Sequence, residues 1–238
     1  MTLSGRVHVV AGGTGRAGTV VVQALIERGA IVAVPSRNPA RLARLRDKVA
    51  SDRLHGFAGD ISDLADAERL RDAIAAELGP IDAVVASLGE WWEGAALAEL
   101  DPAVWQRILA DNLTSHFMVA RAFLPAVADR PGAVYLTLGG IASVLAVAGS
   151  GPISVTGAAQ AMMMRVLEAE LAGRAVRLHE VDVYTPIVTD DWDGGEIEPG
   201  WLTGRDVGAY VADALEPGFA GPLFLTIPGD TAFRRNEA

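Results

Sequence analysis

An apolar run that ends in closely spaced glycines constrains the fold of this chain more than any other stretch. Residues 7–11 read VHVVA, and the next segment, GGTGRAG, places Gly12, Gly15 and Gly18 three residues apart. The apolar run predicts a buried strand, and a second apolar run beyond Gly18 predicts a helix. Glycine permits positive φ, close approach of the backbone to a ligand and tight helix–strand packing. Such a turn can present the N–H groups of a helix start to a phosphate, although glycine-rich turns also serve as plain strand–helix connections.

The composition excludes several classes of protein. A chain of 238 residues, half of them hydrophobic, is long enough for one large α/β domain. The formal net charge of −10 argues against a nucleic-acid partner. The chain has no cysteine, and its four histidines are scattered, so we predict no disulfide, thiol chemistry or metal site. The apolar region 141–164 is interrupted by three glycines and a proline, which makes it a poor membrane span. Without a recognisable signal peptide, we expect a soluble cytoplasmic protein that binds no membrane.

Strand-like and helix-like segments alternate along the chain. The expected strands are residues 7–11, 31–34, 54–57, 83–86, 133–138, 176–183 and 223–227. Helical segments stand between them, including 64–78, 102–127, 154–171 and 206–215. The strands are apolar on both faces and the connections are short, which is typical of a parallel sheet covered by helices on both faces. We therefore predict one doubly wound α/β domain of about seven strands over residues 1–238, with a small lid around 186–201.

Several segments resemble the short-chain dehydrogenase/reductase family over essentially the whole chain. Gly12 and Gly18 match its glycine-rich turn, in which Arg16 here replaces the middle glycine. Asp60-Ile61 is similar to the pair that holds the adenine ring, and Asn112 to the asparagine of a central helix. The alternative for Asn112 is a polar side chain on a solvated helix face. The resemblance implies a Rossmann-type fold and a nicotinamide cofactor held by Gly12, Thr14, Gly15, Arg16, Ala17, Gly18, Arg37, Asp60, Ile61, Ser87, Leu88, Gly89, Ile187 and Thr189.

The turn after the second expected strand favours NADP(H) over NAD(H). An acidic residue there would bind the adenosine ribose hydroxyls and repel a 2′-phosphate. No Asp or Glu stands between Ala30 and Arg46, and the turn carries Arg37. Together with Arg16, this arginine could hold a 2′-phosphate by charge-assisted hydrogen bonds. The alternative is that Arg37 is a solvated charge at the start of a helix.

The family's Ser-Tyr-Lys catalytic set has no counterpart in this chain. The segment from Arg165 to Leu171 resembles the end of the catalytic helix, and counting back from it places Ile153 at the tyrosine, Gly157 at the lysine and Gly140 at the serine. No tyrosine lies between Tyr135 and Tyr184, and the only lysine is Lys48. We expect Asn112 and Tyr184 to be the polar groups nearest the nicotinamide. Tyr184 would either donate the proton or serve as an aromatic wall of the pocket.

Tryptophans gather in the two segments that cover the substrate cleft in this family. Trp91, Trp92 and Trp192 indicate an apolar or aromatic small-molecule substrate, or else a buried lid or subunit contact. We hypothesise an NADPH-dependent carbonyl reductase with an unusual proton donor. The alternatives are an inactive NADP(H)-binding regulator or scaffold, and a redox-neutral lyase or isomerase. The resemblance also implies a homodimer or homotetramer.

Overall fold

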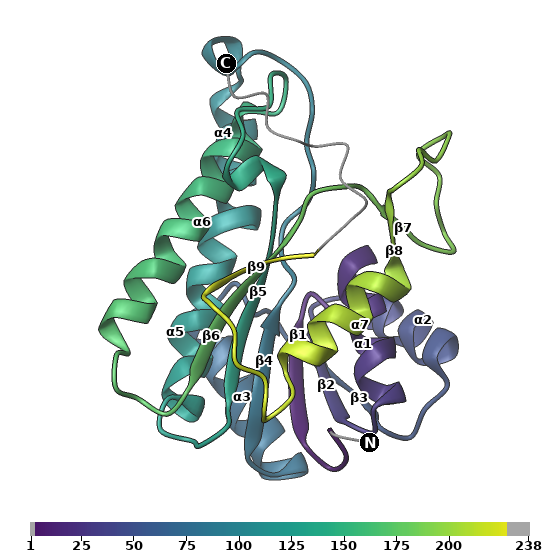
Figure 1. Cartoon of the computed structure of the whole chain (residues 1–238), viewed down its shortest axis with the longest axis vertical. Coiled ribbons are helices and arrows are strands. Elements are labelled where there is room, and N and C mark those ends of the chain that lie inside the picture. Colours follow the sequence, from purple (N-terminus) through teal and green to yellow (C-terminus); the bar gives the residue numbers. More distant parts are fainter. Residues whose placement is uncertain (1–2, 228–238) are drawn as a thin grey trace.

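A seven-stranded parallel sheet forms the centre of the computed structural model, which describes residues 3–227 (Figure 1). The strands are β1 (Val7–Ala11), β2 (Ile31–Ser36), β3 (Leu54–Ala58), β4 (Ile81–Ala86), β5 (Val134–Gly140), β6 (Arg177–Val183) and β9 (Phe224–Thr226). Their order across the sheet is β3-β2-β1-β4-β5-β6-β9. From β1 the chain first adds β2 and β3 on one side and then β4, β5 and β6 on the other, so the strand order changes direction between β1 and β4. Open parallel sheets form a ligand crevice at such a point. The predicted doubly wound α/β fold is confirmed.

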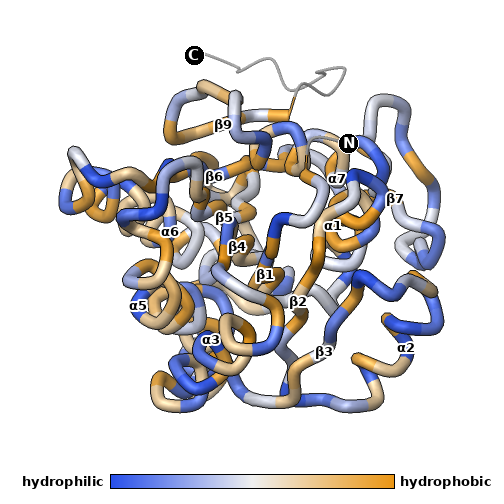
Figure 2. Tube along the Cα trace, turned by 90° about the horizontal axis from the view of Figure 1, so that it is seen from below, coloured by the Kyte–Doolittle hydropathy of each residue, from blue (hydrophilic) through white to orange (hydrophobic). Residues whose placement is uncertain are grey.

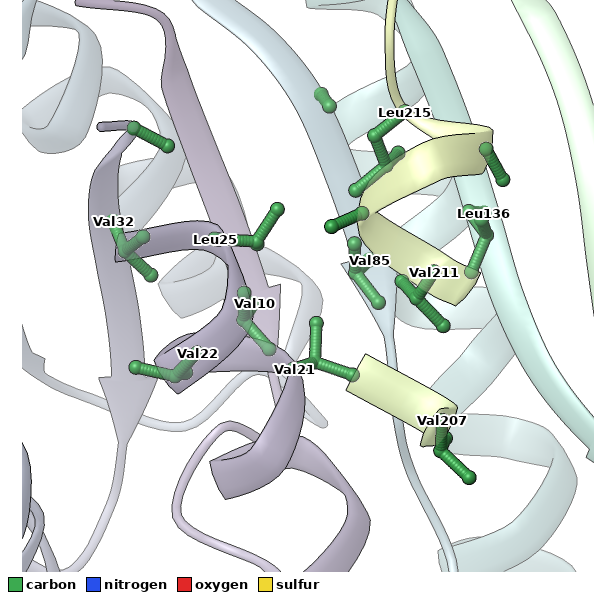
Figure 3. Packing of buried hydrophobic residues seen from close by; sticks show 14 of the residues in the cluster. Val10, Val21, Val22, Leu25, Val32, Val85, Leu136, Val207, Val211 and Leu215 are labelled. Carbon is green, nitrogen blue, oxygen red and sulfur yellow. The ribbon is translucent and has the colours of Figure 1, made fainter. Parts of the chain in front are cut away.

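Helices cover both faces of the sheet. They are α1 (Arg16–Glu27), α2 (Pro39–Val49), α3 (Leu64–Leu78), α4 (Pro102–Leu109), α5 (Ser115–Val127), α6 (Gly151–Glu170) and α7 (Gly204–Ala214). Helices α1, α2 and α7 pack on one face, where Val22 of α1 and Val211 of α7 share a cluster with Val10 of β1 (Figure 3). Helices α3, α5 and α6 pack on the other face through residues such as Ile74 and Phe123. Figure 2 shows the two helix layers on opposite sides of the sheet.

Capping residues explain where several helices begin. The side chains of Asn38, Asp63 and Asp101 each accept a backbone hydrogen bond from the first turn of the helix that follows. Pro39 and Pro102 occupy the first turns of α2 and α4, where a missing N–H costs no helical hydrogen bond. The start of a helix at Asp101-Pro102, predicted from the sequence, is confirmed.

Two local features differ from the expected elements. The predicted helix 102–127 is interrupted by a π-helical turn, Ala110–Thr114, between α4 and α5. Two short strands, β7 (Ile187–Val188) and β8 (Leu202–Thr203), pair in parallel at the base of the acidic segment 189–201. No helix within residues 3–227 is long and apolar enough to cross a bilayer.

Candidate functional site

The three spaced glycines of the first turn have different structural roles. Gly12 has a φ of +79°, and a Cβ atom there would overlap the backbone carbonyl of Ser87 at the end of β4. A Cβ on Gly18 would overlap the carbonyl of Gly12, so this glycine lets α1 pack directly on the turn. Gly15 is the N-cap of α1 and makes no side-chain cap. A Cβ atom on Gly15 would meet only the Gly12 carbonyl oxygen within 4 Å. The N–H groups of the first turn of α1 are therefore open to an anion.

A cavity of about 630 Å³ lies between this turn, the end of β2 and the end of β4. Its polar lining comes mainly from four consecutive βα connections, those after β1, β2, β3 and β4, at the edge of the sheet where the carboxyl ends of the strands meet. Nine of the fourteen predicted cofactor residues line it, namely Gly12, Thr14, Gly15, Arg37, Asp60, Ile61, Ser87, Leu88 and Gly89. The cavity contains two basic side chains, Arg37 and Arg41, together with backbone N–H donors and the apolar Ile61, which fits a phosphorylated ligand with a flat ring.

Arg37 and Asp60 face each other across this cavity. Their side chains form an ion pair of 3.7 Å, and both are substantially exposed. Burial opposes ionisation of Asp60, but hydrogen bonds from Ser62 and the nearby Arg37 outweigh it and lower the pKa of Asp60. Asp60 is thus a carboxylate that already has a cationic partner at this site.

Arg16 lies on the other side of the glycine-rich turn. It lines a second cavity, of about 920 Å³, together with Thr189. Its guanidinium pairs with Asp193 at 2.8 Å and lies 6.0 Å from the ring of Trp192. The structure therefore places Arg16 and Arg37, the two arginines predicted to bind one phosphate, in adjacent cavities rather than in one.

Three further predicted cofactor residues line neither of these two cavities. Gly18 lies beneath the turn, and Ala17 is in the first turn of α1. Ile187 pairs with Leu202 and packs against the apolar core. These positions support the turn and the strand that follows β6.

Asn112 lies in the π-helical turn and holds the segment after β4. Its side-chain oxygen accepts from the backbone N–H of Glu90 at 3.2 Å, and its amide nitrogen donates to the Glu90 carbonyl at 2.9 Å. A Cβ on Gly89 would lie 2.9 Å from the Asn112 side chain. Because both polar groups of the amide bind the Glu90 backbone, the geometry indicates a positioning role. π-Helical turns are frequent at functional sites for such reasons.

The positions expected for the Ser-Tyr-Lys set gather around a 3₁₀ turn, Ile141–Ser143. Gly140 directly precedes the turn, and Ile153 packs with Ala142 in a small apolar cluster. A Cβ on Gly157 would lie 3.2 Å from the backbone nitrogen and the Cα of Ser143. Helix α6 therefore approaches this turn so closely that a larger residue at 157 would press on the turn backbone.

The tryptophans divide between two places. Trp92 packs on the cluster that contains Ile153 and Ala142, so it lies beside the expected catalytic positions, whereas Trp91 is exposed. Trp192 packs edge-to-face on Trp201, with 5.5 Å between ring centroids, and lies over Arg16. Of the three predicted substrate-pocket residues, the structure thus brings only Trp92 to the expected catalytic positions.

Tyr184 directly follows β6 at the carboxyl edge of the sheet. Its neighbour Val183 pairs with Gly140 of β5, so Tyr184 lies near the level of the expected catalytic positions. The ring is partly exposed.

The structure also shows two buried carboxyl groups that the sequence analysis did not select, Glu180 and Asp182 of β6. The Ser143 hydroxyl lies 3.5 Å from Asp182, at the outer limit of a hydrogen bond. The available signal was the pair of acidic residues two positions apart, Glu180 and Asp182, alternating with valines at the end of the predicted strand 176–183. Two acids on one face of a buried strand are costly and therefore mark a special environment.

Comparison with known proteins gives a consistent result. A family model described as short chain dehydrogenase matches residues 6–190. A D-threitol dehydrogenase from Mycolicibacterium smegmatis is 30% identical over 203 residues, which cover 81% of this chain and 75% of that protein. A blue fluorescent protein from a metagenomic library, solved with NADPH, is similar in structure, with a TM-score of 0.82, 22% identity and coverage of 96% and 98% of the two chains. A 3-ketoacyl-(acyl-carrier-protein) reductase from Brucella melitensis, solved with NADH, has a TM-score of 0.82, 18% identity and coverage of 94% and 97%.

Proposed function

The chain belongs to the short-chain dehydrogenase family of oxidoreductases, and we propose on that premise that it uses NADPH to reduce a carbonyl group on an apolar or aromatic substrate. The cavity of 630 Å³ would hold the adenosine half of the cofactor, with the diphosphate at the open N-terminus of α1. The bound cofactor would supply a hydride. The chain's own residues then have to orient the substrate and provide a proton.

The observation that carries the choice of NADPH is the cation in the adenosine cavity. The end of β2 carries Ser36, Arg37 and Asn38, with no carboxylate that would bind a ribose 2′-hydroxyl. Similar structures were solved with NADPH and with NADH, so the fold accommodates either, and the preference depends on local charge. Arg37 is exposed enough to turn from Asp60 towards a 2′-phosphate.

The site around the 3₁₀ turn supports an unusual supply of the proton. Ile153 and Gly157 stand where the family resemblance places its tyrosine and lysine, and neither can transfer a proton. The apolar cluster of Trp92, Ile153 and Ala142 beside these positions would suit an aromatic or aliphatic substrate.

Replacing Arg37 tests the cofactor assignment. We expect Arg37→Ala to weaken NADPH binding about 10- to 100-fold, since hydrogen bonds to charged groups contribute roughly 1.5–3 kcal/mol. NADH binding should change less than about 2-fold because NADH lacks the 2′-phosphate. Cofactor fluorescence titration measures both.

Arg44→Ala is the matched control, because Arg44 is, like Arg37, an exposed arginine but stands in α2 and lines the second cavity only. It should leave both affinities unchanged. A wild-type protein that binds NADH as tightly as NADPH would contradict the assignment. A protein that binds neither cofactor would contradict the proposed function as a whole.

A catalytically inactive NADP(H)-binding regulator or scaffold is the second candidate. The tight contact between Gly157 and the Ser143 backbone favours it, because a larger residue at 157 would require the turn backbone to shift by a few tenths of an ångström. NADPH consumption against a panel of quinones and aromatic ketones separates the two. Turnover supports the reductase, and tight binding without turnover supports the regulator.

A further inference from the structure

Two carboxyl groups are built into the sheet directly below the expected catalytic positions. Glu180 and Asp182 lie two residues apart on β6, so their side chains leave the same face of the strand, towards α6. Glu180 is 0% and Asp182 4% exposed. Gly139 pairs with Asp182 in the neighbouring strand, and a Cβ there would overlap Asp182 Oδ1 and lie 2.9 Å from Glu180 Oε1. Glycine at position 139 therefore makes the space that the pair occupies.

The two carboxyl groups have different partners. Glu180 Oε2 accepts from Thr137 Oγ1 at 3.1 Å and from Gln160 Nε2 at 3.3 Å, both deeper in the layer between the sheet and α6. Glu180 Oε1 has no hydrogen-bond partner within the described part of the chain. Asp182 lies two residues nearer the carboxyl edge of the sheet, where its hydrogen-bond partner is the Ser143 hydroxyl. Asp182 is thus the member of the pair that reaches the site.

Ser143 connects the pair to the expected reaction centre. It is half-buried and ends the 3₁₀ turn around which Gly140, Ile153 and Gly157 gather. A serine hydroxyl alone is a poor acid at neutral pH, but an adjacent carboxyl group can return the proton that it gives up. Hydrogen bonds in catalytic chains are often long without substrate and shorten when it binds, which accommodates the 3.5 Å separation.

The environment raises the pKa of both carboxyl groups above the ordinary range of Asp and Glu. Burial raises the pKa of Glu180 to about 7, reinforced by Asp182 and opposed by Gln160, Thr137 and Arg165. Burial raises the pKa of Asp182 to about 6, opposed by the Ser143 hydrogen bond and Arg165. Arg165 of α6 is the charged group that faces the pair from a packed element. The adjoining strands offer uncharged side chains, Thr137 from β5 and Phe224 and Thr226 from β9.

We propose that Ser143 is the proton donor to the substrate carbonyl oxygen and that Asp182 is the positioning residue that resupplies it. The inference rests on the proposed reductase function. Bound NADPH would supply the hydride to the carbonyl carbon and so become NADP⁺, and the carbonyl oxygen takes the Ser143 proton as the C=O π bond becomes a C–O single bond. Ser143 Oγ takes a proton from the Asp182 carboxyl group in the same movement. Asp182 is left as a carboxylate, which water reprotonates before the next turnover.

The pH dependence of kcat tests this relay, with NADPH and 9,10-phenanthrenequinone as the probe. Activity of the wild-type protein should fall as pH rises above about 6, because Asp182 loses its proton in that range. Asp182→Asn and Ser143→Ala should each lower kcat about 100-fold, the usual size of a lost acid–base contribution. Asp182→Asn should also abolish the fall in activity with rising pH. Ser143→Thr, which keeps the hydroxyl, should retain most of the wild-type activity.

Glu180→Gln is the matched control, because it changes an equally buried carboxyl group of the same pair that does not reach Ser143. This variant should keep kcat within about 3-fold of the wild type, and its activity should fall over the same or a lower pH range. If Asp182→Asn and Glu180→Gln have equal effects, or if Asp182→Asn retains wild-type activity, the relay is overturned. A wild-type protein that reduces no quinone or aromatic ketone overturns the proposed function instead.

Infrared spectroscopy of the cofactor-free protein provides a readout independent of turnover. A carboxylic acid C=O band should titrate near pH 6, disappear in Asp182→Asn and shift in frequency in Ser143→Ala. The absence of such a band, or a band that Ser143→Ala does not move, would show that Asp182 holds no proton for Ser143 and would overturn the relay.

Discussion

At the scale of single residues, the glycine-rich turn is determined as much by internal packing as by any ligand. Gly12 and Gly18 are required because β4 and the turn itself occupy the space of a side chain, and only Gly15 leaves the start of α1 open. A glycine pattern in a sequence cannot separate these causes, since each of them excludes a Cβ atom.

Gly12 and Gly5 offer a comparison that isolates the packing contribution. Both have positive φ, +79° and +74°, but a Cβ on Gly5 would meet nothing within 4 Å. We expect Gly5→Ala to cost about 1 kcal/mol of unfolding free energy from backbone conformation alone. Gly12→Ala should cost roughly 3 kcal/mol more, because β1 and β4 must separate. Urea unfolding curves measure both; equal costs would show that packing against Ser87 is unimportant.

The residues of the adenosine cavity could be predicted because they occupy the ends of successive strands, where parallel-sheet topology brings them together. Arg37 and Asp60 are in contact for that reason. The position of Arg16 could not be predicted, since it depends on an ion pair with Asp193, 177 residues away in sequence. Asp182 was not predicted, because the strands were described as apolar on both faces although strand 176–183 contains Glu180 and Asp182.

At the scale of elements, exposed ion pairs link segment 189–201 to the glycine-rich turn and to α2. Asp193 pairs with Arg16, and Asp191 pairs with Lys48 of α2 at 2.8 Å. The sequence predicted a small lid around 186–201 but not its ion pairs with Arg16 and Lys48, which are distant in the sequence. The predicted strands nevertheless agree with the structure within two residues at each end.

Breaking the ion pair between Arg16 and Asp193 should strengthen NADPH binding. We expect Asp193→Asn to raise NADPH affinity about 2- to 5-fold at low salt, because an exposed ion pair contributes at most about 1 kcal/mol and the phosphate must displace it. At 1 M salt the difference should vanish. Asp190→Asn is the control, since Asp190 forms no ion pair within residues 3–227. Fluorescence titration that finds Asp193→Asn equal to the wild type at low salt would show that the Arg16–Asp193 pair does not compete with the cofactor.

The π-helical turn is a second feature of elements that periodicity did not predict. Residues 102–127 keep helical spacing throughout, so the sequence indicates one helix. The extra residue per turn appears only where Asn112 binds the Glu90 backbone in space. A distant contact, which is not encoded in the local pattern, accompanies the irregularity.

At the scale of the whole molecule, the sheet order follows from the alternation of strands and helices in the sequence. Each strand–helix–strand unit has to cross in the same sense, which leaves few arrangements for seven strands. Helices α5 and α6 expose large apolar side chains to solvent, among them Phe117 at 51% and Met162 at 55%. Such patches mark contact surfaces.

We propose that this chain forms a homodimer or homotetramer through the exposed face of α5 and α6. Met162→Glu should dissociate it, because the change places a charge in an apolar contact. Ile197→Glu is the control, since Ile197 is equally exposed, at 50%, but lies on segment 189–201. Sedimentation velocity measures the mass of each. A monomeric wild-type protein, or dissociation by Ile197→Glu alone, would contradict the proposal.

The contact between the first and last helices has a consequence for how the protein is made. Gly208 of α7 lies against the backbone of Val20 in α1, and Val21, Val207 and Val211 share one core (Figure 3). A nascent chain therefore carries α1 with the part of its apolar surface that faces α7 uncovered until residues 204–214 have left the ribosome. We expect the glycine-rich turn, although it is synthesised long before α7, to be among the last parts of the protein to become rigid.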